Sequence, residues 1–261
     1  MRCREQVVVI TGASMGIGEA LARAFLAEGG RVVMSSRDIG RIEEARRRVG
    51  TLERSAAVAC DASRREQINA LVSKSGELFG KIDVWVNNAG YGLQDSVVSM
   101  SMDECRRMFE TNLFGAIECM QAVTPVFKQQ GHGTIINISS VVGHLPIPFL
   151  GAYSATKHAL NAISEAARLE LESGGIRVIS VCPGRIRTNF NVNTVRGSQG
   201  KRLGEAVQRG ISPERCARAI LRGYLRGSRE IFVPWHGWWI SHLYEMCPGM
   251  VELALRRMMR S

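Results

Sequence analysis

Several features that would place this 261-residue chain in a special class of proteins are missing from its sequence. No run of about 18 or more apolar residues occurs, so a membrane-spanning helix is not expected. No low-complexity tract occurs either, and 45% of the residues are hydrophobic against 22% charged, which argues against a disordered chain. The sequence therefore predicts a globular protein with enough length for a large hydrophobic core.

The seven cysteines are scattered and never form the Cys-x-x-Cys pair that is usual in zinc and redox motifs. Their number is odd, and no secretory signal peptide is recognised before the first strand-like segment. Both observations favour reduced thiols over disulfide bonds. We therefore expect mostly buried, reduced cysteines in a cytoplasmic protein, and we expect no metal site.

Acidic residues are scarce in the last third of the chain. Residues 185–261 contain 14 Lys/Arg but only 5 Asp/Glu, a net charge of +9, whereas residues 1–184 carry a net charge of +1. Such a basic segment suits a solvated surface or an anionic partner, which would be a phosphorylated ligand, a membrane surface or nucleic acid. Because no nucleic-acid-binding module accompanies it, a nucleic-acid partner is not expected.

Apolar, β-branched runs alternate with amphipathic segments along most of the chain. Strands are expected near residues 6–10, 31–36, 56–60, 82–86, 134–138, 177–182 and 230–233. Helices are expected near 17–27, 39–49, 64–79, 104–130 (one long helix or two abutting ones), 152–172 and 213–226. This order predicts a single doubly wound α/β domain over residues 1–261, with about seven parallel strands covered by helices on both faces. Residues 185–212 are interpreted as a substrate-loop insertion and 234–261 as a C-terminal appendage.

A glycine-rich turn joins the first expected strand to the first expected helix. Its sequence is Thr11-Gly12-Ala13-Ser14-Met15-Gly16-Ile17-Gly18. Small residues there would let the backbone approach a pyrophosphate, and the N-terminus of the next helix would present unpaired N–H groups to it. A plain turn is the alternative, but the position between a strand and a helix favours phosphate binding.

This spacing, Thr-Gly-x-x-x-Gly-x-Gly, resembles that of the short-chain dehydrogenase/reductase family. Further motifs of that family follow in order: Asn87-Asn88-Ala89-Gly90, Asn112 in Thr-Asn-Leu-Phe-Gly, Ser140, Tyr153-x-x-x-Lys157, and Pro183-Gly184 with Thr188 four residues later. Each motif is weak alone, but together they are highly specific. The resemblance implies a Rossmann-type fold and an oxidoreductase that interconverts a small-molecule carbonyl and an alcohol by hydride transfer with a nicotinamide cofactor.

The resemblance also implies a catalytic group of Asn112, Ser140, Tyr153 and Lys157. Tyr153 would be the acid in reduction and the base in oxidation, and Lys157, one helical turn away, would lower the pKa of Tyr153 and hold the nicotinamide ribose. Ser140 would hydrogen-bond the substrate oxygen, and Asn112 would hold a water that links Lys157 to solvent. Each assignment has a structural alternative. Tyr153 and Lys157 could be an ordinary pair on an amphipathic helix. Ser140 could be a strand-end hydroxyl that bonds its own backbone, and Asn112 could be a helix-kink or cap residue.

The choice of cofactor depends on the tip of the second strand. Enzymes that use NAD usually place an acidic residue there, whereas the family alignment puts Ser36 at this position, followed by Arg37. A guanidinium suits a 2′-phosphate, so NADP(H) is expected rather than NAD(H). If the family alignment were shifted by one residue, the carboxylate of Asp38 would lie close to the cofactor ribose. Asp61 resembles the adenine-contacting aspartate of the family, with an N-cap of the next helix as the alternative.

The cofactor-binding residues implied by the resemblance come from the glycine-rich turn, the strand tips and the catalytic helix. They are Gly12, Ser14, Met15, Gly16, Ile17, Gly18, Ser36, Arg37, Asp61, Ala62, Asn88, Ala89, Gly90, Tyr153, Lys157, Pro183, Gly184, Ile186 and Thr188.

Aromatic residues make up only 6% of the chain, yet Trp235, Trp238, Trp239 and Tyr244 lie within ten residues near its end. This cluster could be a lid over a bulky apolar substrate, a subunit interface, or an element on an anionic membrane surface. Core packing with a solvated end is the fourth alternative. Relatives that act on lipids, steroids or retinoids make an apolar substrate the expectation, and a homodimer or homotetramer is expected.

A second function of a different class is a cofactor-binding regulator or scaffold that keeps the fold but has no turnover. Loss of Tyr153 or Lys157 would be the signature of such a protein. Both residues are present, so the sequence favours the enzyme.

Overall fold

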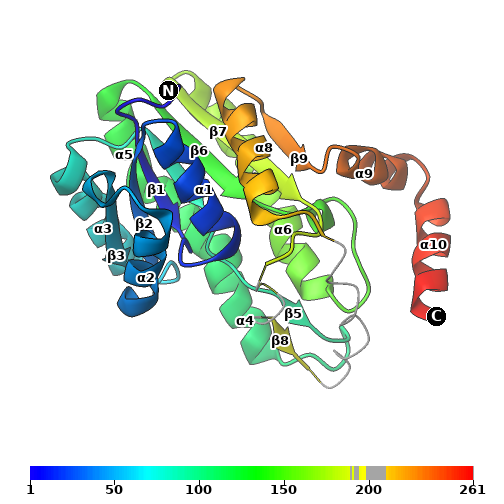
Figure 1. Ribbon diagram of the computed structural model, residues 1–261. Coiled ribbons are helices and arrows are strands. Elements are labelled where there is room, and N and C mark those ends of the chain that lie inside the picture. The colour runs from blue at the N-terminus through cyan, green and yellow to red at the C-terminus, as the bar shows by residue number, and fades with distance from the viewer. Residues whose placement is uncertain (189, 191–193, 198–209, 261) are drawn as a thin grey trace.

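The computed structural model describes residues 1–188, 190, 194–197 and 210–260, and its centre is a parallel β-sheet (Figure 1). The strands are β1 (Val7–Thr11), β2 (Arg31–Ser36), β3 (Ser55–Ala59), β4 (Val84–Asn87), β6 (Gly133–Ile138), β7 (Ile176–Pro183) and β9 (Glu230–Val233). They form one seven-stranded sheet in the order β3-β2-β1-β4-β6-β7-β9, and every neighbouring pair is parallel. The predicted seven-stranded parallel sheet is thus confirmed.

Helices cover both faces of this sheet, as the sequence predicted. One face is packed by α1 (Gly16–Ala27), α2 (Ile39–Val49) and α8 (Pro213–Leu225). The other is packed by α3 (Arg65–Phe79), α5 (Gly115–Gln130) and α6 (Gly151–Glu172). A hydrophobic core lies on each face of the sheet. Successive residues of a strand pack alternately into these two cores, because side chains alternate across a sheet. In β1, for example, Val8 and Ile10 belong to the first core and Val9 to the second.

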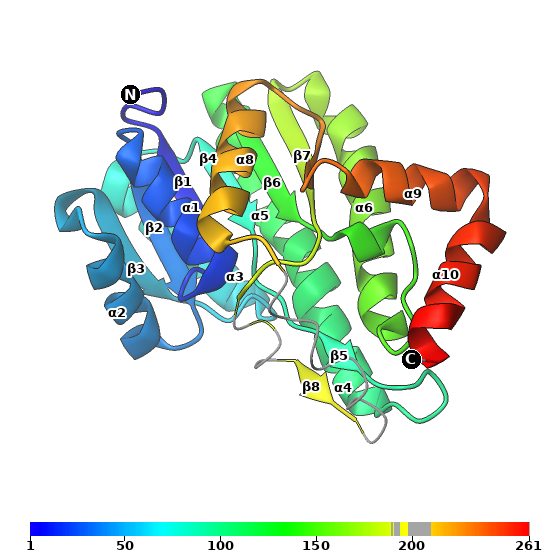
Figure 2. The same ribbon diagram turned by 45° about the vertical axis from the view of Figure 1, so that its right-hand side comes forward.

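The order of the strands fixes where a ligand site can form. After β1 the chain moves outward through β2 to β3 and then returns to place β4 on the other side of β1. The helices after β1 and β4 therefore lie on opposite faces, and a crevice opens beyond the carboxyl ends of these two strands. The segments that follow the neighbouring strands β6 and β7 lie at the same end of the sheet (Figure 2) and contribute residues to the tyrosine-containing pocket there.

The expected helix over 104–130 is two helices, α4 (Met102–Phe109) and α5, joined by a π-helical turn over Glu110–Phe114. Single π-turns within α-helices are frequent at functional sites. Two short strands, β5 (Leu93–Gln94) and β8 (Val195–Arg196), were not predicted and pair in a separate sheet. Two residues are too few to show a periodic pattern.

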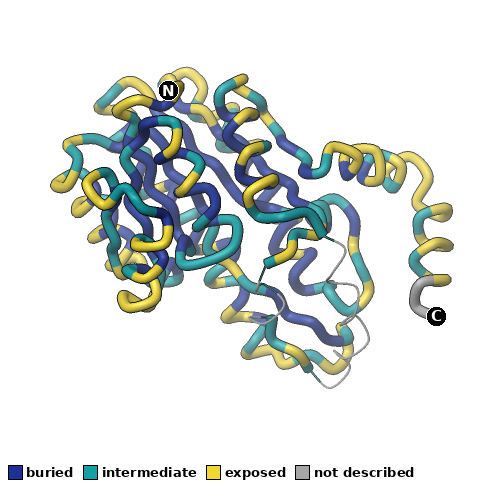
Figure 3. Tube along the Cα trace, in the orientation of Figure 1, coloured by how far each residue is buried: buried dark blue, intermediate teal, exposed yellow. Residues whose placement is uncertain are grey.

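The last 28 residues contain two helices, α9 (Gly237–Met246) and α10 (Pro248–Arg260). They extend away from the β9 edge of the sheet, and α10 turns sharply from α9 (Figures 1 and 2). Figure 3 shows that most of this tail is exposed. No helix in the described part of the chain is both long and apolar enough to cross a membrane. Of the expected substrate loop, residues 189, 191–193 and 198–209 lie outside the described residues.

Candidate active site

Two adjacent pockets open at the carboxyl ends of the strands. The turn pocket, of about 570 Å³, follows the glycine-rich turn and the tip of β2. The tyrosine pocket, of about 360 Å³, lies over Ser140, Tyr153 and Lys157. Both volumes are in the range of small-molecule sites. The pockets meet at the residues that line both, which are Ile17, Asn88, Gly90, Thr188 and Phe190.

The glycine-rich turn forms one wall of the turn pocket because its backbone can adopt conformations closed to other residues. Gly12 and Gly16 have φ values of +65° and +64°, in the left-handed region that glycine tolerates without a steric cost. A Cβ at Gly12 would also lie only 2.8 Å from the Cα of Ala89. The turn therefore packs directly against the segment after β4.

The N-terminus of α1 is the second part of this wall. The helix begins at Gly16, and the side chain of its N-cap residue, Met15, makes no capping hydrogen bond to the first turn. Gly16 and Ile17 of that turn line the pocket. Backbone N–H groups at a helix N-terminus, together with the helix dipole, favour an anion.

The segment after β4 is hydrogen-bonded to the glycine-rich turn. The Asn88 side-chain amide donates to the carbonyls of Thr11 and Gly12, both at 2.9 Å. The Thr11 hydroxyl in turn accepts the backbone N–H groups of Asn88 and Ala89, both at 3.1 Å. Asn88 thus shapes the backbone, and it also lines both pockets.

The tip of β2 presents Ser36, Arg37 and Asp38 to the turn pocket, together with Arg41 from α2, which sequence reasoning did not single out. The Asp38 carboxylate accepts the backbone N–H of Arg41 at 3.0 Å and pairs with the Arg41 guanidinium at 3.5 Å. Asp38 is therefore the N-cap of α2, and its charge faces a cation. Arg37 is exposed at the rim.

Asp61 and Ala62, beyond the end of β3, also line the turn pocket. The Asp61 carboxylate accepts the N–H and the hydroxyl of Ser63, at 3.0 and 2.7 Å. The N-cap of α3 is Arg64, so the alternative that Asp61 caps this helix is wrong. The short side chain bonds to the turn before the helix instead, a common use of aspartate.

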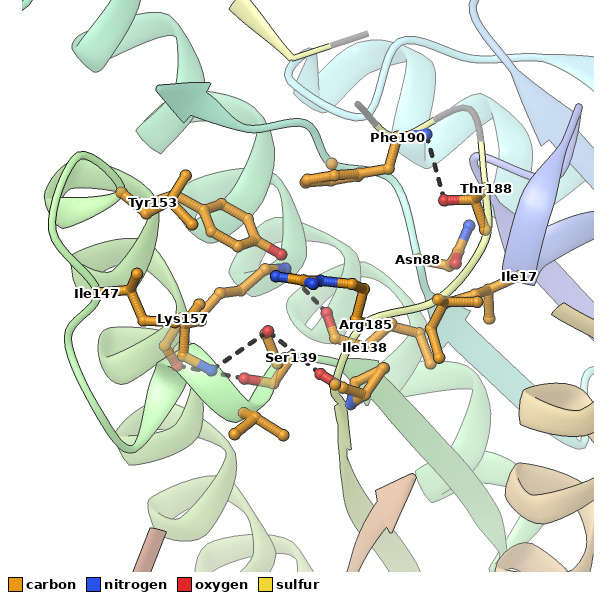
Figure 4. A pocket seen from close by; sticks show the side chains of 18 residues that line it. Ile17, Asn88, Ile138, Ser139, Ile147, Tyr153, Lys157, Arg185, Thr188 and Phe190 are labelled. Carbon is orange, nitrogen blue, oxygen red and sulfur yellow. Dashed lines mark hydrogen bonds between the residues drawn. The ribbon is translucent and has the colours of Figure 1, made fainter. Parts of the chain in front are cut away.

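Tyr153 and Lys157 lie one turn apart on α6, and both are buried in the tyrosine pocket. The Lys157 amine donates to the Ile138 carbonyl at 2.9 Å and lies 5.8 Å from the centre of the Tyr153 ring. Burial lowers the pKa of Lys157 to about 8, because a charged amine loses its hydration. In Figure 4 the Tyr153 hydroxyl and the Lys157 amine point into the same pocket.

The expectation that the pKa of Tyr153 lies below its usual value is wrong. Burial raises the pKa of Tyr153 above its usual value, and a hydrogen bond with Ser140 opposes this only in part. The physical reason is that the phenolate would lose its hydration in the pocket. The phenol is therefore protonated at neutral pH, which is the form that can donate a proton.

Ser140 lies where β6 ends and caps the short 3-10 turn that follows. Its hydroxyl accepts the N–H of Val142 at 3.3 Å and donates to the Pro183 carbonyl at the same distance. The Ser140 side chain also opposes part of the rise in the pKa of Tyr153. The hydroxyl therefore has local backbone partners and faces the tyrosine as well.

Asn112 lies in the π-helical turn and is buried. Its amide pairs with the backbone of Tyr91: the side-chain oxygen accepts the Tyr91 N–H at 3.0 Å, and the side-chain nitrogen donates to the Tyr91 carbonyl at 2.8 Å. A Cβ at Gly90 would lie 2.9 Å from the Asn112 oxygen and 3.8 Å from the Lys157 amine. Asn112 thus belongs to the π-helical turn, and its side-chain amide also lies near the amine of Lys157.

Pro183, Gly184, Ile186 and Thr188 continue from β7 and line the tyrosine pocket. Thr188 also reaches the glycine-rich turn, since a Cβ at Gly16 would lie 3.2 Å from its methyl group. Sequence reasoning missed several further lining residues, among them Arg185 and Phe190. Arg185 could have been found, because it lies inside a matched motif between Gly184 and Ile186.

The tertiary structure also brings together His144, Cys182 and Glu230, which no sequence spacing connects. Their possible metal-ligating atoms lie within 4.8 Å of one another, although no metal site was expected from the sequence. The His144 ring nitrogen contacts the Glu230 carboxylate at 3.0 Å and the Cys182 sulfur at 3.3 Å. Burial raises the pKa of the Cys182 thiol. These contacts tie the loop after Ser140 to β7 and β9.

Comparison with known proteins extends this description. The short chain dehydrogenase family model matches residues 6–199. "Dehydrogenase/reductase SDR family protein 7-like" of Drosophila melanogaster is 33% identical over 235 residues, 87% of this chain and 72% of that protein. "Dehydrogenase/reductase SDR family member 7B" of Bos taurus is 34% identical over 237 residues, 87% of this chain and 73% of that protein.

Solved structures agree with these sequence matches. The 3-ketoacyl-(acyl-carrier-protein) reductase from Brucella melitensis, complexed with NADH, has a TM-score of 0.76 at 29% identity and covers 85% of this chain and 91% of its own. The alcohol dehydrogenase from Thermococcus sibiricus, complexed with 5-hydroxy-NADP, has a TM-score of 0.74 at 29% identity. The match covers 87% of this chain and 95% of that protein. The family match covers the glycine-rich turn, Tyr153 and Lys157, and the chain therefore belongs to the short-chain dehydrogenase/reductase family of oxidoreductases.

Proposed function

We propose that this protein is an NADP(H)-dependent oxidoreductase that interconverts a carbonyl and a primary or secondary alcohol. The observation that carries the proposal is the position of Tyr153 in the pocket that Ser140 also lines, one helical turn from Lys157. This group lies in a pocket that meets the one built on the glycine-rich turn. A proton donor and a dinucleotide-sized cleft are thus adjacent.

The residues present fit a nicotinamide dinucleotide. Gly12, which has no side chain, lines the turn pocket, and the first turn of α1, which receives no capping hydrogen bond from the Met15 side chain, lines the same pocket. We assign the pyrophosphate to this turn and the adenosine end to Ser36, Arg37, Asp61 and Ala62. When bound, the nicotinamide would supply or accept the hydride.

Tyr153 would give its proton to the carbonyl oxygen during reduction and take it back during oxidation. Its buried phenol is protonated at neutral pH, and a substrate oxygen beside it would accept both this proton and a hydrogen bond from Ser140. The Lys157 amine would hold the ribose hydroxyls and place a positive charge beside the developing phenolate. Asn112, next to Lys157, would hold the water through which protons leave.

The direct test is a panel of aldehydes and ketones, from short aldehydes to steroid and long-chain ketones, followed by NADPH and NADH absorbance. Turnover that depends on Tyr153, with Tyr153→Phe as the comparison, supports the proposal. A protein that binds NADPH but reduces no member of the panel would instead be the regulator or scaffold without turnover.

We propose NADP(H) over NAD(H) because the two cations at the tip of β2, Arg37 and Arg41, line the turn pocket while Asp38 is engaged with Arg41. Arg37→Ala is expected to weaken NADPH binding about 10- to 100-fold, the range for losing a hydrogen bond to a charged group. NADH binding should change far less. Titration of cofactor fluorescence measures both, with Arg47→Ala, an exposed arginine of α2 away from the pocket, as control. Equal losses for the two cofactors would refute this preference.

An apolar substrate of the lipid, steroid or retinoid type is proposed from the walls of the tyrosine pocket. Apolar side chains from the loop between β6 and α6 face it, together with Phe190, whose ring lies 5.4 Å from that of Tyr153. The loop residues are Val141, Val142, Ile147 and Leu150. Apolar walls with a few polar groups are usual for sites that bind such molecules.

For the tail we propose peripheral contact with an anionic membrane surface. Trp235, Trp239 and Met246 are 71%, 60% and 81% exposed, and Arg256 and Arg257 follow on α10. Tryptophan and arginine are both favoured at the boundary between an anionic headgroup layer and the acyl chains. The rest of the protein is proposed to be a single cytoplasmic domain that forms a homodimer or homotetramer, and its seven free thiols support a reducing compartment.

Trp239→Ala is expected to weaken binding to phosphatidylcholine vesicles that contain phosphatidylserine about tenfold, because burial of one large side chain contributes roughly 1.5–3 kcal/mol. Co-sedimentation measures this, and Leu78→Ala on α3 is the exposed apolar control. If the variant binds vesicles like the wild type but loses its oligomeric state in light scattering, the tail is a subunit interface instead.

A further inference from the structure

The cluster of His144, Cys182 and Glu230 takes no part in the mechanism above, and its three side chains come from separate segments. His144 follows the 3-10 turn Val141–Gly143, Cys182 lies in β7, and Glu230 begins β9. Their possible ligand atoms lie within 4.8 Å of one another. Histidine, cysteine and glutamate all bind zinc in proteins, so this cluster is a candidate cation site.

Neighbouring strands place Cys182 and Glu230 side by side. In the parallel pair of β7 and β9, Ser180 is the register partner of Glu230, and Cys182 is that of Phe232. Residues two apart in a strand point to the same face of the sheet, so Cys182 and Glu230 share a face. The Cys182 sulfur lies 3.4 Å from a Glu230 carboxylate oxygen. His144 completes the cluster, and the centre of its ring lies 5.3 Å from that of Phe232.

Three polar atoms converge on one nitrogen of the His144 ring. This nitrogen, Nε2, lies 3.0 Å from the Glu230 carboxylate, 3.3 Å from the Cys182 sulfur and 3.1 Å from the Asn161 amide nitrogen. A ring nitrogen carries either one hydrogen or one lone pair, so it can direct a hydrogen bond at only one of the three. A cation bound to this nitrogen would attract the sulfur and the carboxylate together.

The spacing of the three ligand atoms is close to that of a zinc site. Zinc binds nitrogen and oxygen at about 2.0–2.2 Å and sulfur at about 2.3 Å, almost always with tetrahedral geometry. Ligand atoms on such a tetrahedron lie about 3.3–3.7 Å apart. The nitrogen, oxygen and sulfur atoms of this cluster are 3.0, 3.3 and 3.4 Å apart. A small outward movement of the side chains would therefore admit the ion.

The donor set favours zinc over calcium and magnesium. Those two cations take oxygen ligands, whereas zinc combines thiolate, imidazole and carboxylate. On binding, zinc would replace the thiol proton of Cys182, which would leave to solvent. The thiolate and the Glu230 carboxylate would then supply two negative charges, which balance the charge of the ion.

The surroundings of the cluster supply a path for the ion and a partner for a bound water. The side chains of His144 and Glu230 are 15% and 30% exposed, whereas Cys182 is buried. An ion can therefore reach the cluster from the side of Glu230. The Asn161 amide donates to the Gly143 carbonyl at 2.9 Å, and its oxygen is buried with no hydrogen-bond partner among the described residues. A water on the ion could donate to this oxygen.

We propose that His144, Cys182 and Glu230 form a zinc site, with water as the fourth ligand, that stabilises the folded protein. None of these three residues lines the turn pocket or the tyrosine pocket, and the proposal does not depend on the carbonyl–alcohol activity. The ion would link the segment after Ser140 to β7 and β9. Cys182 directly precedes Pro183, whose carbonyl accepts the Ser140 hydroxyl, so the ion would hold both sides of that contact.

The test measures zinc binding by the full-length protein without cofactor or substrate. Metal is removed with a chelator, zinc chloride is titrated in competition with a chromophoric chelator, and elemental analysis counts zinc per chain. Cobalt(II) is a second probe, because a cysteine ligand gives a charge-transfer band from thiolate to cobalt. The variants are Cys182→Ser, His144→Gln and Glu230→Gln. Cys247→Ser is the matched control, because this thiol is exposed and outside the cluster.

We expect the wild type and Cys247→Ser to bind one zinc per chain, and each of the three cluster variants to bind it more than about 100-fold more weakly. Loss of an outer partner of a ligand already costs about 10- to 100-fold in metal affinity, so loss of the ligand itself should cost more. Cys182→Ser should also lose the cobalt band. Zinc should raise the thermal unfolding midpoint of the wild type but not of Cys182→Ser, because it binds the folded cluster in preference to the unfolded chain.

Either of two results would overturn the proposal. If the wild type binds no zinc while circular dichroism shows that it is folded, the cluster is held by hydrogen bonds alone. If Cys182→Ser or Glu230→Gln binds zinc like the wild type, or if Cys247→Ser abolishes binding, the ion lies elsewhere. Should Cys182→Ser fail to fold, the cobalt band of the wild type and the zinc affinity of Glu230→Gln, which keeps the shape of the side chain, decide the question.

Discussion

Replacing Tyr153 by phenylalanine is expected to lower kcat/KM for carbonyl reduction by about 10²- to 10⁴-fold, the range that a positioned general acid supplies. The change removes one hydroxyl from a buried residue in the pocket that Ser140 also lines, and it leaves the ring in contact with Phe190. NADPH binding should be nearly unchanged, since the turn pocket keeps all its residues. Stopped-flow absorbance of NADPH gives the rate, and fluorescence titration gives the cofactor affinity.

Tyr91→Phe is the matched control for this experiment. Tyr91 lines the turn pocket, and burial raises its pKa as well, but its hydroxyl is not hydrogen-bonded to Ser140. Loss of that hydroxyl should leave the rate of reduction within about twofold of the wild type, because it is not the proposed acid. If Tyr153→Phe and Tyr91→Phe reduce the same ketone equally well, Tyr153 is not the acid and the proposed mechanism is wrong.

Replacing Lys157 by methionine is expected to have two opposite effects: turnover is lost, and the protein without ligand becomes more stable. The amine is buried, and its pKa is lowered to about 8 from an ordinary value of 10.5. One pKa unit corresponds to about 1.4 kcal/mol, so the buried charge costs about 3 kcal/mol. The Ile138 carbonyl would lose its partner, which offsets part of the gain. A net stabilisation of about 1–2 kcal/mol at pH 7 remains.

The sign of the pH dependence follows from the direction of that shift. Because the folded-state pKa lies below that of the unfolded chain, the cost of the buried charge is fully present below pH 8. As the pH rises from about 8 toward 10.5, the folded protein loses this proton first and the cost fades. The advantage of Lys157→Met should therefore shrink over this range.

Urea unfolding of the wild type and Lys157→Met at several pH values between 7 and 10 measures this difference. Lys128→Met, at an exposed lysine of α5, is the control and should show no such trend. A Lys157→Met protein that is less stable than the wild type at pH 7 would mean that the amine contributes more through its hydrogen bond than its burial costs. That result would contradict the prediction.

The sequence determined the fold because the order of strands and helices leaves few topologies open. Seven apolar runs, separated by amphipathic helices, predict parallel strands with helices on both faces, and the observed order β3-β2-β1-β4-β6-β7-β9 has that architecture. The expected helices over 39–49 and 213–226 match α2 (Ile39–Val49) and α8 (Pro213–Leu225) within one residue. Strong periodicity and clear end signals make long elements predictable.

Motif spacing also identified many of the residues that line the two pockets, from Gly12 to Thr188. The motifs that begin at Thr11, Asn87 and Pro183 lie at the carboxyl ends of strands, which meet at one edge of a parallel sheet, so their order along the chain already implies their proximity. Tyr153 and Lys157 lie on α6 instead. Their chemical roles remain predictions that the variants above would test. The short strands β5 and β8 gave no signal, because two residues cannot show a period.

Other features were decided by the tertiary structure alone. Only the folded chain shows that Asp38 faces Arg41 and that both polar atoms of Asn112 bond to the backbone of Tyr91. The pKa of Tyr153 is raised rather than lowered, because burial depends on the whole pocket and not on the distance to Lys157 along the helix. The same holds for His144 and Glu230, which lie 86 residues apart in the sequence, yet the His144 ring nitrogen lies 3.0 Å from a Glu230 carboxylate oxygen.

The sequence by itself therefore determined the sheet, the family and the places where the motifs meet, because these depend on local periodicity and on order along the chain. The tertiary structure decided which side chains are buried, which charges face each other, and that Arg185 shares a pocket with Tyr153. Those properties depend on packing between segments far apart in the chain, and no local pattern records them.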